Sequence, residues 1–344
     1  MTSTGNIAII GGGVAGIESA GQLARAGYSV IIAERSGSKG GHLSDWHQLF
    51  PDRRSSKDIM EYLEKQADHS NITFMYDTEI SGVEKKQGAF MLSAGDGRTI
   101  EADAVIVASG FDLFRGERKE EYGYGIYDNV ITSADLEEMF RNGRIQLTNG
   151  EEPKRIGLIH CVGSRDEKVG NLYCSKLCCV TAVKQAIEIK EHIKDARIYC
   201  FYMDMRMGGA YYEELYREAQ EDYGIGFIRG KVSEVGVSFH KTLIAKVEDT
   251  LAGRPLKMEL DLVVLMVGME ASESGRILAE NSGLKSGMNR FFESADSYFR
   301  TNRSNIEGIF FAGTCTAPMS IPETISHARA AVSETLDYLK NGKA

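Results

Sequence analysis

The stretch that decides the fold is NIAIIGGGVAG, residues 6–16, followed by a helical pattern that runs to about Gly27. The apolar residues 6–10 predict a short buried strand, and the glycines after them predict a tight turn into a helix. A second apolar strand follows at Tyr28–Ala33 and ends on Glu34. A strand, a glycine loop, a helix and a strand in this order form one βαβ unit, which predicts a parallel, doubly wound sheet.

Gly11, Gly13 and Gly16 have the G-x-G-x-x-G spacing of a dinucleotide-binding loop. The first glycine permits the turn, the second lets the backbone approach a pyrophosphate, and the third lets helix and sheet pack closely. The helix N-terminus offers free N–H groups and a partial positive charge to that anion. Glu34 lies where a carboxylate accepts ribose hydroxyls and repels the 2′-phosphate of NADP. A helix-capping loop in an unrelated α/β protein is the alternative interpretation.

Three more distant segments favour FAD over NAD. Gly40-Gly41 follows Glu34 at a distance typical of FAD domains. Ala108-Ser109-Gly110 resembles the ATG element of those domains, and residues 308–313 resemble their closing GIFAAGD segment. Thr314 stands where that segment usually has aspartate. We therefore expect FAD to be bound by Gly11, Gly13, Val14, Ala15, Gly16, Glu34, Arg35, Gly40, Gly41, His42, Leu43, Ile80, Ser109, Gly110, Gly313, Thr314, Ile321, Pro322 and Thr324.

The rest of the chain indicates a second α/β domain inserted into the first. A three-stranded meander covers the first sheet, and a last helix, opening after Pro322, closes that domain. The fold class is therefore α/β, with two Rossmann-like three-layer domains of the two-dinucleotide-binding flavoprotein type. We expect an FAD domain of residues 1–114 and 288–344, and an inserted domain of residues 115–287. The expected elements are the meander 73–76, 80–85 and 89–94, the strands 104–108, 155–160, 197–202, 226–228, 262–267 and 309–312, a hairpin region 231–260, and the helices 173–193, 211–223 and 323–339.

The inserted domain carries cysteines where a second glycine loop would lie. After the strand 155–160 no G-x-G-x-x-G follows, and Cys161, Cys174, Cys178 and Cys179 occur as C-x12-C-x3-C-C. On a helix that begins near Cys174, the last three thiols converge on one end, and Cys161 at a strand terminus supplies the fourth. Four thiolates near a helix N-terminus suit a 4Fe-4S cluster. Structural zinc and four buried thiols without a metal are the alternatives.

Two further cysteines lie outside this motif. Cys200 falls inside an apolar strand and is expected in the core. Cys315 follows Thr314 near the expected flavin. Its role is therefore either packing in the core or redox chemistry.

These motifs together resemble the A-type subunit of heterodisulfide reductase. The resemblance rests on residues 160–166, 173–179 and 204–206, and on Pro322-Glu323-Thr324 before the last helix. It implies FAD in the first domain and a 4Fe-4S cluster held by the four cysteines of the inserted domain.

The long methanogenic versions of this protein carry ferredoxin-type cysteine runs, which this sequence lacks. The resemblance therefore points to the short form in heterodisulfide-reductase-like complexes of sulfur oxidisers. It implies a homodimer that sits among B- and C-type iron-sulfur subunits. The related short flavin subunit of the quinone-interacting membrane-bound oxidoreductase complex of sulfate reducers is the alternative.

Composition narrows the possible partners. The sequence has 40 Lys and Arg against 49 Asp and Glu, a net charge of −9, which argues against nucleic-acid and anionic-membrane partners. It shows no apolar run long enough for a membrane span, and it begins with a strand rather than a signal peptide. We therefore expect a cytoplasmic protein with reduced thiols.

Two functional hypotheses follow from the sequence. The first is an oxidoreductase subunit in which FAD and the cluster pass electrons to and from partner subunits. The second is a self-sufficient NAD(P)H-dependent disulfide oxidoreductase, which needs a redox cysteine pair and a second glycine loop. The sequence contains neither a C-x-x-C pair nor that loop, and so it favours the first hypothesis.

Overall fold

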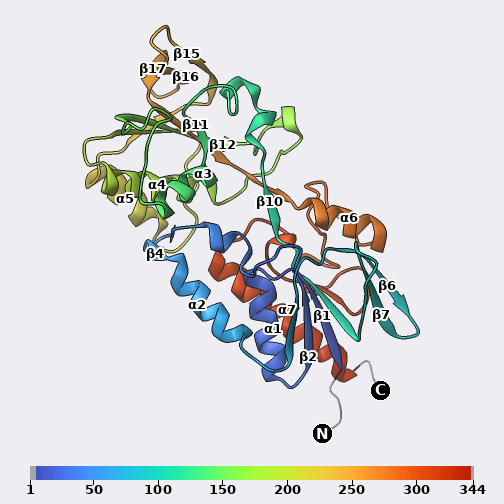
Figure 1. Ribbon diagram of the computed structural model, residues 1–344. Coiled ribbons are helices and arrows are strands. Elements are labelled where there is room, and N and C mark those ends of the chain that lie inside the picture. Colours follow the sequence, from blue (N-terminus) through green and yellow to red (C-terminus); the bar gives the residue numbers. More distant parts are fainter. Residues whose placement is uncertain (1–4, 342–344) are drawn as a thin grey trace. The chain divides into compact units, whose positions relative to one another are not determined.

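The computed structural model describes residues 5–341 and divides the chain into two compact units (Figure 1). Unit 1 comprises the chain up to Ser44, Lys57–Asp112 and the chain from Glu270 onward, whereas unit 2 comprises Asp45–Ser56 and Leu113–Met269. Two short paired strands, β10 (Phe111–Leu113) and β19 (Met269–Ala271), lie where the chain passes between the units. The inserted topology expected from the sequence is therefore present.

These limits differ from the expected boundaries in three segments, residues 45–56, 113–114 and 270–287. Residues 270–287 cluster with unit 1, because helix α6 (Glu273–Ser282) lies against the strand β6 (Ile80–Lys86). There, Asn281 Nδ2 donates to the carbonyl of Ser81 at 2.7 Å, and Ser282 Oγ accepts from the N–H of Val83 at 2.8 Å. Asp45–Ser56 clusters with unit 2.

Unit 1 is built on a parallel five-stranded sheet, as the opening βαβ pattern predicts. The strand order is β20-β9-β1-β2-β5, and each neighbouring pair is parallel. Helices α1 and α7 share one apolar cluster with this sheet, in which Ala20 and Leu23 of α1 meet Ala328 and Ala331 of α7. The elements are β1 (Asn6–Ile10), α1 (Val14–Arg25), β2 (Ser29–Ala33), α2 (Ser56–Ala67), β5 (Ile72–Met75), β9 (Ala104–Val107), β20 (Ile309–Phe311) and α7 (Ile321–Asn341).

An antiparallel meander packs on the sheet of unit 1, but its strands differ from those expected. It consists of β6, β7 (Ala89–Ala94) and β8 (Thr99–Ala102). Residues 73–76 were expected as its first strand, and this prediction is wrong. They lie largely in β5, which pairs in parallel with β2 at the edge of the main sheet. The alternation of side chains is the same in both settings, and the pairing partner decides between them.

Unit 2 repeats the doubly wound arrangement. Its parallel sheet has the order β11-β18-β12-β13-β14, and β18 is buried along its whole length, as its continuous apolar run predicts. A three-stranded antiparallel sheet, β15-β16-β17, fills the region where a hairpin was expected. The elements are β11 (Val130–Thr132), α3 (Ser133–Arg141), β12 (Arg155–Val162), α4 (Cys178–His192), β13 (Arg197–Tyr202), α5 (Tyr212–Glu221), β14 (Gly226–Arg229), β15 (Val232–Val237), β16 (Leu243–Asp249), β17 (Arg254–Leu260) and β18 (Leu262–Val267).

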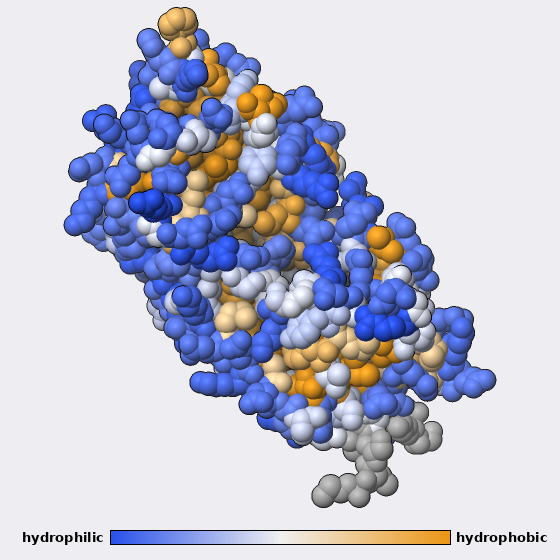
Figure 2. Space-filling model, in the orientation of Figure 1, coloured by the Kyte–Doolittle hydropathy of each residue, from blue (hydrophilic) through white to orange (hydrophobic). Residues whose placement is uncertain are grey.

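Short elements complete both units. The face seen in Figure 2 is mostly hydrophilic and is interrupted by separate apolar patches. Within residues 5–341, no helix is long and apolar enough to cross a membrane. The short elements are the strands β3 (Gln48–Leu49) and β4 (Arg54–Ser55) and the 3-10 helices η1 (Gly41–Asp45), η2 (Gly116–Arg118), η3 (Glu120–Tyr122), η4 (Glu167–Val169) and η5 (Gly313–Cys315).

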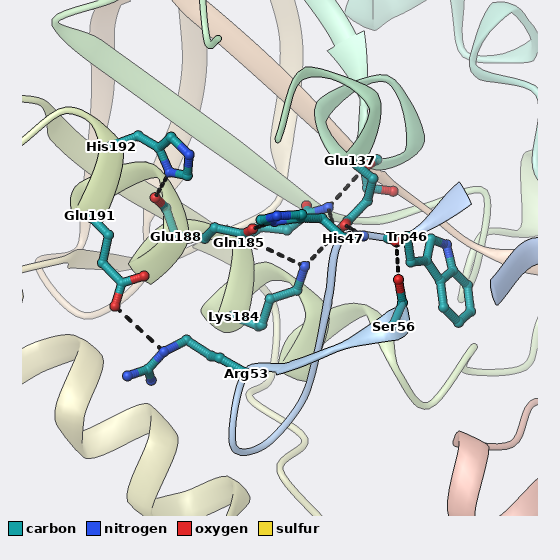
Figure 3. A network of polar contacts seen from close by, with 11 residues as sticks. Trp46, His47, Arg53, Ser56, Glu137, Lys184, Gln185, Glu188, Glu191 and His192 are labelled. Carbon is teal, nitrogen blue, oxygen red and sulfur yellow. Dashed lines mark hydrogen bonds and ion pairs between the residues drawn. The ribbon is translucent and has the colours of Figure 1, made fainter. Parts of the chain in front are cut away.

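A buried polar network holds Asp45–Ser56 in unit 2 (Figure 3). The backbone N–H of His47 donates to Glu137 at 2.9 Å, and the ring of His47 contacts Glu188. Lys184 is 1% exposed, contacts Glu137 and lies 3.1 Å from Glu188. Gln185 Nε2 donates to Glu137 at 2.7 Å. Two buried carboxylates thus share one buried ammonium, a pattern that gave no periodic signal in the sequence.

Arg53 fixes the other end of the same segment. Its guanidinium lies 3.1 Å from Glu218 and 3.6 Å from Glu191, and these contacts raise the pKa of Arg53 against the opposing effect of burial. The ring of Phe50 packs edge-on against Tyr212 at a centroid distance of 5.5 Å. The hairpin is therefore held at one end by the hydrogen bonds of His47, at the other end by the ion pairs of Arg53, and between them by an aromatic contact.

We expect Lys184→Met to destabilise the protein by about 3–5 kcal/mol, because it leaves two buried carboxylates without their cation. Urea unfolding followed by circular dichroism measures the effect. Lys194→Met changes an exposed lysine just beyond the end of the same helix and should shift stability by less than about 0.5 kcal/mol. Equal stability of the two variants would show that the network carries no net charge-pairing energy.

Candidate functional site

The glycine loop of unit 1 has the geometry that its spacing predicts. Gly11 has φ +109°, and a Cβ placed there would lie 2.4 Å from the carbonyl oxygen of Ala108. A Cβ on Gly16 would lie 1.9 Å from the carbonyl oxygen of Gly11, so the third glycine permits the close approach of helix and loop. A Cβ on Gly13 would meet only Gly41 Cα, at 4.0 Å. The protein leaves the space beside Gly13 open, as a site for a pyrophosphate requires.

The N-terminus of α1 faces this open space with Val14 and Ala15 in its first turn. Gly13 occupies the N-cap position and has no side chain that could bond to the first N–H groups. The first turn contains no acidic residue that could neutralise the helix dipole. The end of α1 therefore keeps the donors and the partial positive charge that bind phosphate oxygens.

Glu34 lies at the end of β2 and is 7% exposed. Its carboxylate accepts from the N–H of Gly12 at 2.6 Å and from the N–H and hydroxyl of Ser36, both at 2.8 Å. These bonds hold the carboxylate beside the glycine loop. Oε1 accepts both bonds from Ser36, whereas Oε2 accepts only from Gly12 and retains capacity for a further donor. Arg35 turns instead to Asp112, at 3.1 Å.

The segment Gly40–Leu43 lies directly against the glycine loop. The N–H of Gly40 donates to the carbonyl of Gly12 at 2.8 Å, and Gly40 pairs with Gly13 in an isolated bridge. Leu43 is 1% exposed, and His42 Nε2 lies 3.0 Å from the carbonyl oxygen of Phe111. The structure thus brings together two segments that the sequence separates by a strand and a helix.

Ser109 and Gly110 follow β9 at the same end of the sheet. The Ser109 hydroxyl is buried and has no hydrogen-bond partner among the described residues. Gly110 has φ +68°, and its added Cβ would lie 3.9 Å from Thr314 Oγ1. A buried hydroxyl without a partner is costly, and a ligand that bonds to it removes the cost. This orphaned group fits a polar cofactor at the carboxyl ends of the strands.

Gly313, Thr314 and the start of α7 complete this end of unit 1. Gly313 has φ +73°, and an added Cβ would lie 2.7 Å from the Ala15 side chain and 3.0 Å from that of Thr324. Helix α7 begins at Ile321, so that Pro322 lies inside its first turn rather than before it. The Glu323 carboxylate accepts from the N–H of Ser320 at 2.8 Å and from its hydroxyl at 2.9 Å. Glu323 therefore caps its own helix.

Ile80, which was expected to bind FAD, and Cys315, which was expected near the flavin, are both buried in unit 1. Ile80 is 3% exposed and belongs to the apolar cluster between the meander and the sheet. Cys315 is 2% exposed, and its thiol donates to the carbonyls of Val107 at 3.2 Å and Ala312 at 3.4 Å. Burial raises the pKa of Cys315 to about 12, so the group stays a protonated thiol. These contacts favour packing over a redox role for Cys315.

The second site lies in unit 2, between the end of β12 and the start of α4. Cys161 is 6% exposed, and Cys178 and Cys179 are the first two residues of α4, at 6% and 2%. The Sγ atoms of Cys161 and Cys178 are 4.0 Å apart, and Cys179 Sγ lies 3.6 Å from the carbonyl oxygen of Asp204. Three of the four expected ligands therefore converge.

Cys174 lies in the loop before α4 and is half-buried. The expected helix 173–193 begins only at Cys178, because Lys176 adopts φ +62° and Tyr173 bonds elsewhere, its carbonyl accepting from the N–H of Arg165 at 2.9 Å. Cys174 Sγ accepts from the N–H of Lys176 at 3.3 Å. Within residues 5–341, no three His, Cys, Asp or Glu side chains are arranged to hold a single metal ion. Cys174 therefore belongs to the loop and not to the helix.

The backbone around the cysteines is strained. Cys161 and Arg165, neither of them glycine, have φ values of +59° and +54°. An added Cβ on Gly163, where φ is +75°, would lie 2.0 Å from the ring of Phe114. Left-handed conformations of ordinary residues cost energy and gather at functional sites. The turn after β12 is therefore shaped for a purpose other than stability.

The electrostatics of the converging thiols favour thiolates. The pKa of Cys179 is lowered to about 4, chiefly because Cys178 donates a hydrogen bond to its sulfur. The pKa of Cys161 is also lowered, again chiefly by a hydrogen bond from Cys178 and also by the charge of Arg165. The thiolate is the form that binds metals. Two of these three sulfurs are thus favoured as thiolates, whereas the hydrogen bonds with Cys161 and Cys179 raise the pKa of Cys178.

Unpartnered polar groups surround the cysteines. Both ring nitrogens of His160, the Ser164 hydroxyl and one guanidinium nitrogen of Arg165 are buried without a hydrogen-bond partner in the described part of the chain. His160 is 6% and Ser164 1% exposed. Inorganic and cysteine sulfurs of an iron-sulfur cluster accept such hydrogen bonds. The donor set and these orphaned groups both fit a cluster held by thiolates.

A buried ion pair, which the sequence analysis missed, anchors the cysteine loop. Asp166 and Lys119 are 4% and 2% exposed, and Lys119 Nζ lies 2.7 Å from the carboxylate. The side chain of Asn171 donates to the carbonyl of Gly163 at 2.9 Å. The long separation of Lys119 from Asp166 leaves no local signal for their pairing.

Comparison with solved structures gives the fold. The chain is similar to thioredoxin reductase of T. acidophilum, with a TM-score of 0.69, 18% identity and coverage of 99% of both chains. It is also similar to thioredoxin reductase of Lactococcus lactis, with a TM-score of 0.67, 16% identity and coverage of 98% and 99%. The Pyridine nucleotide-disulphide oxidoreductase family model matches residues 5–136. The fold is that of the two-dinucleotide-binding flavoproteins.

Sequence relatives give the family. The A-type subunit of the H(2)/formate:CoB-CoM heterodisulfide,ferredoxin reductase of Methanococcus maripaludis is 40% identical over 251 residues, which cover 71% of this chain and 38% of that protein. The A-type iron-sulfur subunit of the CoB–CoM heterodisulfide reductase of Methanocaldococcus jannaschii is 32% identical over an alignment of 412 positions, covering 94% of this chain and 63% of that protein. The chain belongs to the family of heterodisulfide reductase A-type subunits and spans less than two thirds of the length of these relatives.

Proposed function

We propose that this chain is an electron-transfer oxidoreductase subunit that binds FAD in unit 1 and a 4Fe-4S cluster in unit 2. One observation carries the proposal. At the junction of β12 and α4, where a second dinucleotide-binding loop would lie, converging thiols are found instead. FAD supplies chemistry in one- or two-electron steps, and the cluster supplies single-electron steps.

The residues of unit 1 would hold FAD as follows. The open side of Gly13 and the first turn of α1 receive the pyrophosphate, and the Glu34 carboxylate accepts the ribose hydroxyls. The unpartnered Ser109 hydroxyl and Thr314 lie at the carboxyl end of the sheet and supply further polar contacts. The other residues expected at this site are proposed as its lining.

In unit 2, Cys161, Cys178 and Cys179 supply three thiolates from the end of β12 and the start of α4. Cys174 supplies the fourth from the preceding loop. The guanidinium of Arg165 moderates the negative charge of the sulfurs, which is consistent with its effect on the pKa of Cys161. His160, Ser164 and Arg165 donate hydrogen bonds inward, where the described chain offers them no partner.

The biological setting belongs to the same proposal. The chain serves a heterodisulfide-reductase-like complex of sulfur metabolism, as the short form found in sulfur oxidisers, and acts in the cytoplasm as a homodimer beside B- and C-type iron-sulfur subunits. The names of the relatives, which are subunits of heterodisulfide reductases, support the subunit role. The flavin subunit of a quinone-interacting oxidoreductase complex is the related alternative.

A self-sufficient NAD(P)H-dependent disulfide oxidoreductase is the competing function, and the fold of the thioredoxin reductases favours it. The sequence opposes it, because neither a C-x-x-C pair nor a second glycine loop is present. Anaerobically purified protein separates the two. We expect about four irons per chain, reduction by dithionite with a cluster signal in electron paramagnetic resonance, and no reduction by NADH or NADPH. Rapid reduction by NADPH in iron-free protein would establish the competing function.

A further inference from the structure

The cysteine site reaches solvent at one loop. Cys161, Cys178 and Cys179 are buried, whereas Cys174 is half-buried. Leu172, two residues before Cys174, is 75% exposed, and Lys176, two residues after it, is also exposed. The sulfur site is therefore closest to the surface beneath an exposed leucine and an exposed lysine.

A second loop lies beside this one, and Arg165 ties the two together. The backbone N–H of Arg165 donates to the carbonyl of Tyr173 at 2.9 Å. Its guanidinium donates to the Asp204 carboxylate at 2.7 Å, and the backbone carbonyl of Asp204 lies 3.6 Å from Cys179 Sγ. Residues 203–206 therefore lie next to the cysteines, and Arg206 in this loop is exposed.

This surface is basic on an acidic protein. The chain carries a net charge of −9, yet Arg165, Arg206 and Arg229 surround the single carboxylate of Asp204. The ion pair with Arg165, with smaller contributions from the other two arginines, lowers the pKa of Asp204. Lys176 adds a further cation on the neighbouring loop. An apolar centre with a charged rim is the common composition of a transient protein interface.

We infer that the surface formed by Leu172, Cys174, Lys176 and Arg206, which we call the cysteine-loop surface, docks an acidic, soluble iron-sulfur protein. Leu172 provides the apolar contact, and the cations steer the negatively charged partner. One electron passes between the partner and the cluster, so that one is oxidised by one electron as the other is reduced. This inference rests on the proposed function, because it assigns that single-electron exchange to a place on the chain.

The test uses an acidic 2[4Fe-4S] ferredoxin as the probe and purified full-length protein with its cofactors. Biolayer interferometry measures the association rate at low and at high ionic strength. We expect the double variant Lys176→Glu, Arg206→Glu to associate about tenfold or more slowly at low salt, and the difference to vanish at high salt because exposed charges are then screened. Leu172→Asp should raise the dissociation rate.

The matched control replaces two exposed cations of β17 in the same unit, Arg254 and Lys257, by Glu, and so makes the same change in net charge away from the cysteines. If the control slows association as much as the double variant does, the rate depends only on net charge. The assignment of docking to the cysteine-loop surface would then be wrong. The protein could instead bind no ferredoxin and associate with itself in a concentration-dependent way that the double variant abolishes. That result would overturn the ferredoxin assignment and identify a second copy of the chain as the partner.

The Cys178→Ala variant separates this inference from the proposed function. The docking surface does not need the cluster for contact, so that the iron-free variant should still bind the ferredoxin with the same salt dependence. The wild-type protein could also prove to contain no iron and still bind ferredoxin through the cysteine-loop surface. That result would refute the cluster assignment but support the docking surface. The opposite result is a protein with normal iron content whose cysteine-loop variants bind ferredoxin as well as the parent does. That result would refute the docking surface and leave the cluster assignment unaffected.

Discussion

Cys178→Ala protein should purify with its FAD and without iron. Cys178 lies between two other thiols, 4.0 Å from Cys161 Sγ, and donates the hydrogen bonds that lower the pKa of Cys161 and Cys179. As a ligand Cys178 would be a thiolate, and its replacement leaves only three of the four proposed ligands. Metal analysis and the flavin absorption spectrum of the same preparation measure both cofactors.

Cys200→Ala is the matched control for this experiment. Cys200 is fully buried in β13 of the same unit, and burial raises the pKa of its thiol well above the ordinary value. Its replacement removes a buried sulfur without removing a thiolate ligand, so that iron content should stay near the wild-type level, with a loss of stability of about 1 kcal/mol. Loss of iron in both variants would mean that packing, and not ligation, retains the metal.

A finding of one zinc per chain in the parent protein would contradict the cluster assignment more directly. Zinc requires a closed tetrahedral set of ligands. Within residues 5–341 no three His, Cys, Asp or Glu side chains are arranged to hold a single metal ion, so that metal analysis of the purified protein distinguishes zinc from the proposed cluster.

The glycine loop could be predicted in detail because its requirements are local. Gly11 needs a left-handed backbone and Gly16 needs the absence of a Cβ, and both needs arise within one strand–turn–helix unit. The cysteine motif was recognisable for the same reason. The start of α4 was not, because the contact of Tyr173 with Arg165 and the left-handed Lys176 delay the helix to Cys178.

Features that depend on residues far apart in the chain could not be predicted from the sequence. The segment Asp45–Ser56 follows the FAD-type loop in sequence, and yet it packs in unit 2 through Glu137 and Glu188, which lie far along the chain. The buried pair of Lys119 and Asp166 is of the same kind. Hydrophobic periodicity reports on the faces of helices and strands, whereas isolated buried ion pairs leave no period to detect.

Gly13→Val should fold and bind little or no FAD. The φ of Gly13 is −81°, and an added Cβ would lie 4.0 Å from Gly41 Cα, so that the backbone at this position accepts a Cβ without strain or clash. The valine would instead fill the space in which the backbone approaches the pyrophosphate. Overpacking of such a contact costs about 1–3 kcal/mol, which lowers affinity about ten- to hundredfold.

Two other glycines make this experiment specific. Gly236→Val, in β15 of unit 2, also places a side chain where no atom lies within 4 Å, and it should retain full flavin. Gly16→Val should fail to give soluble protein, because its Cβ would lie 1.9 Å from the carbonyl oxygen of Gly11. Flavin content, circular dichroism and a titration of apoprotein with FAD distinguish these outcomes. A yellow, fully loaded Gly13→Val protein would show that the open space beside Gly13 does not receive the cofactor, because a valine side chain there would fill the space that the pyrophosphate needs.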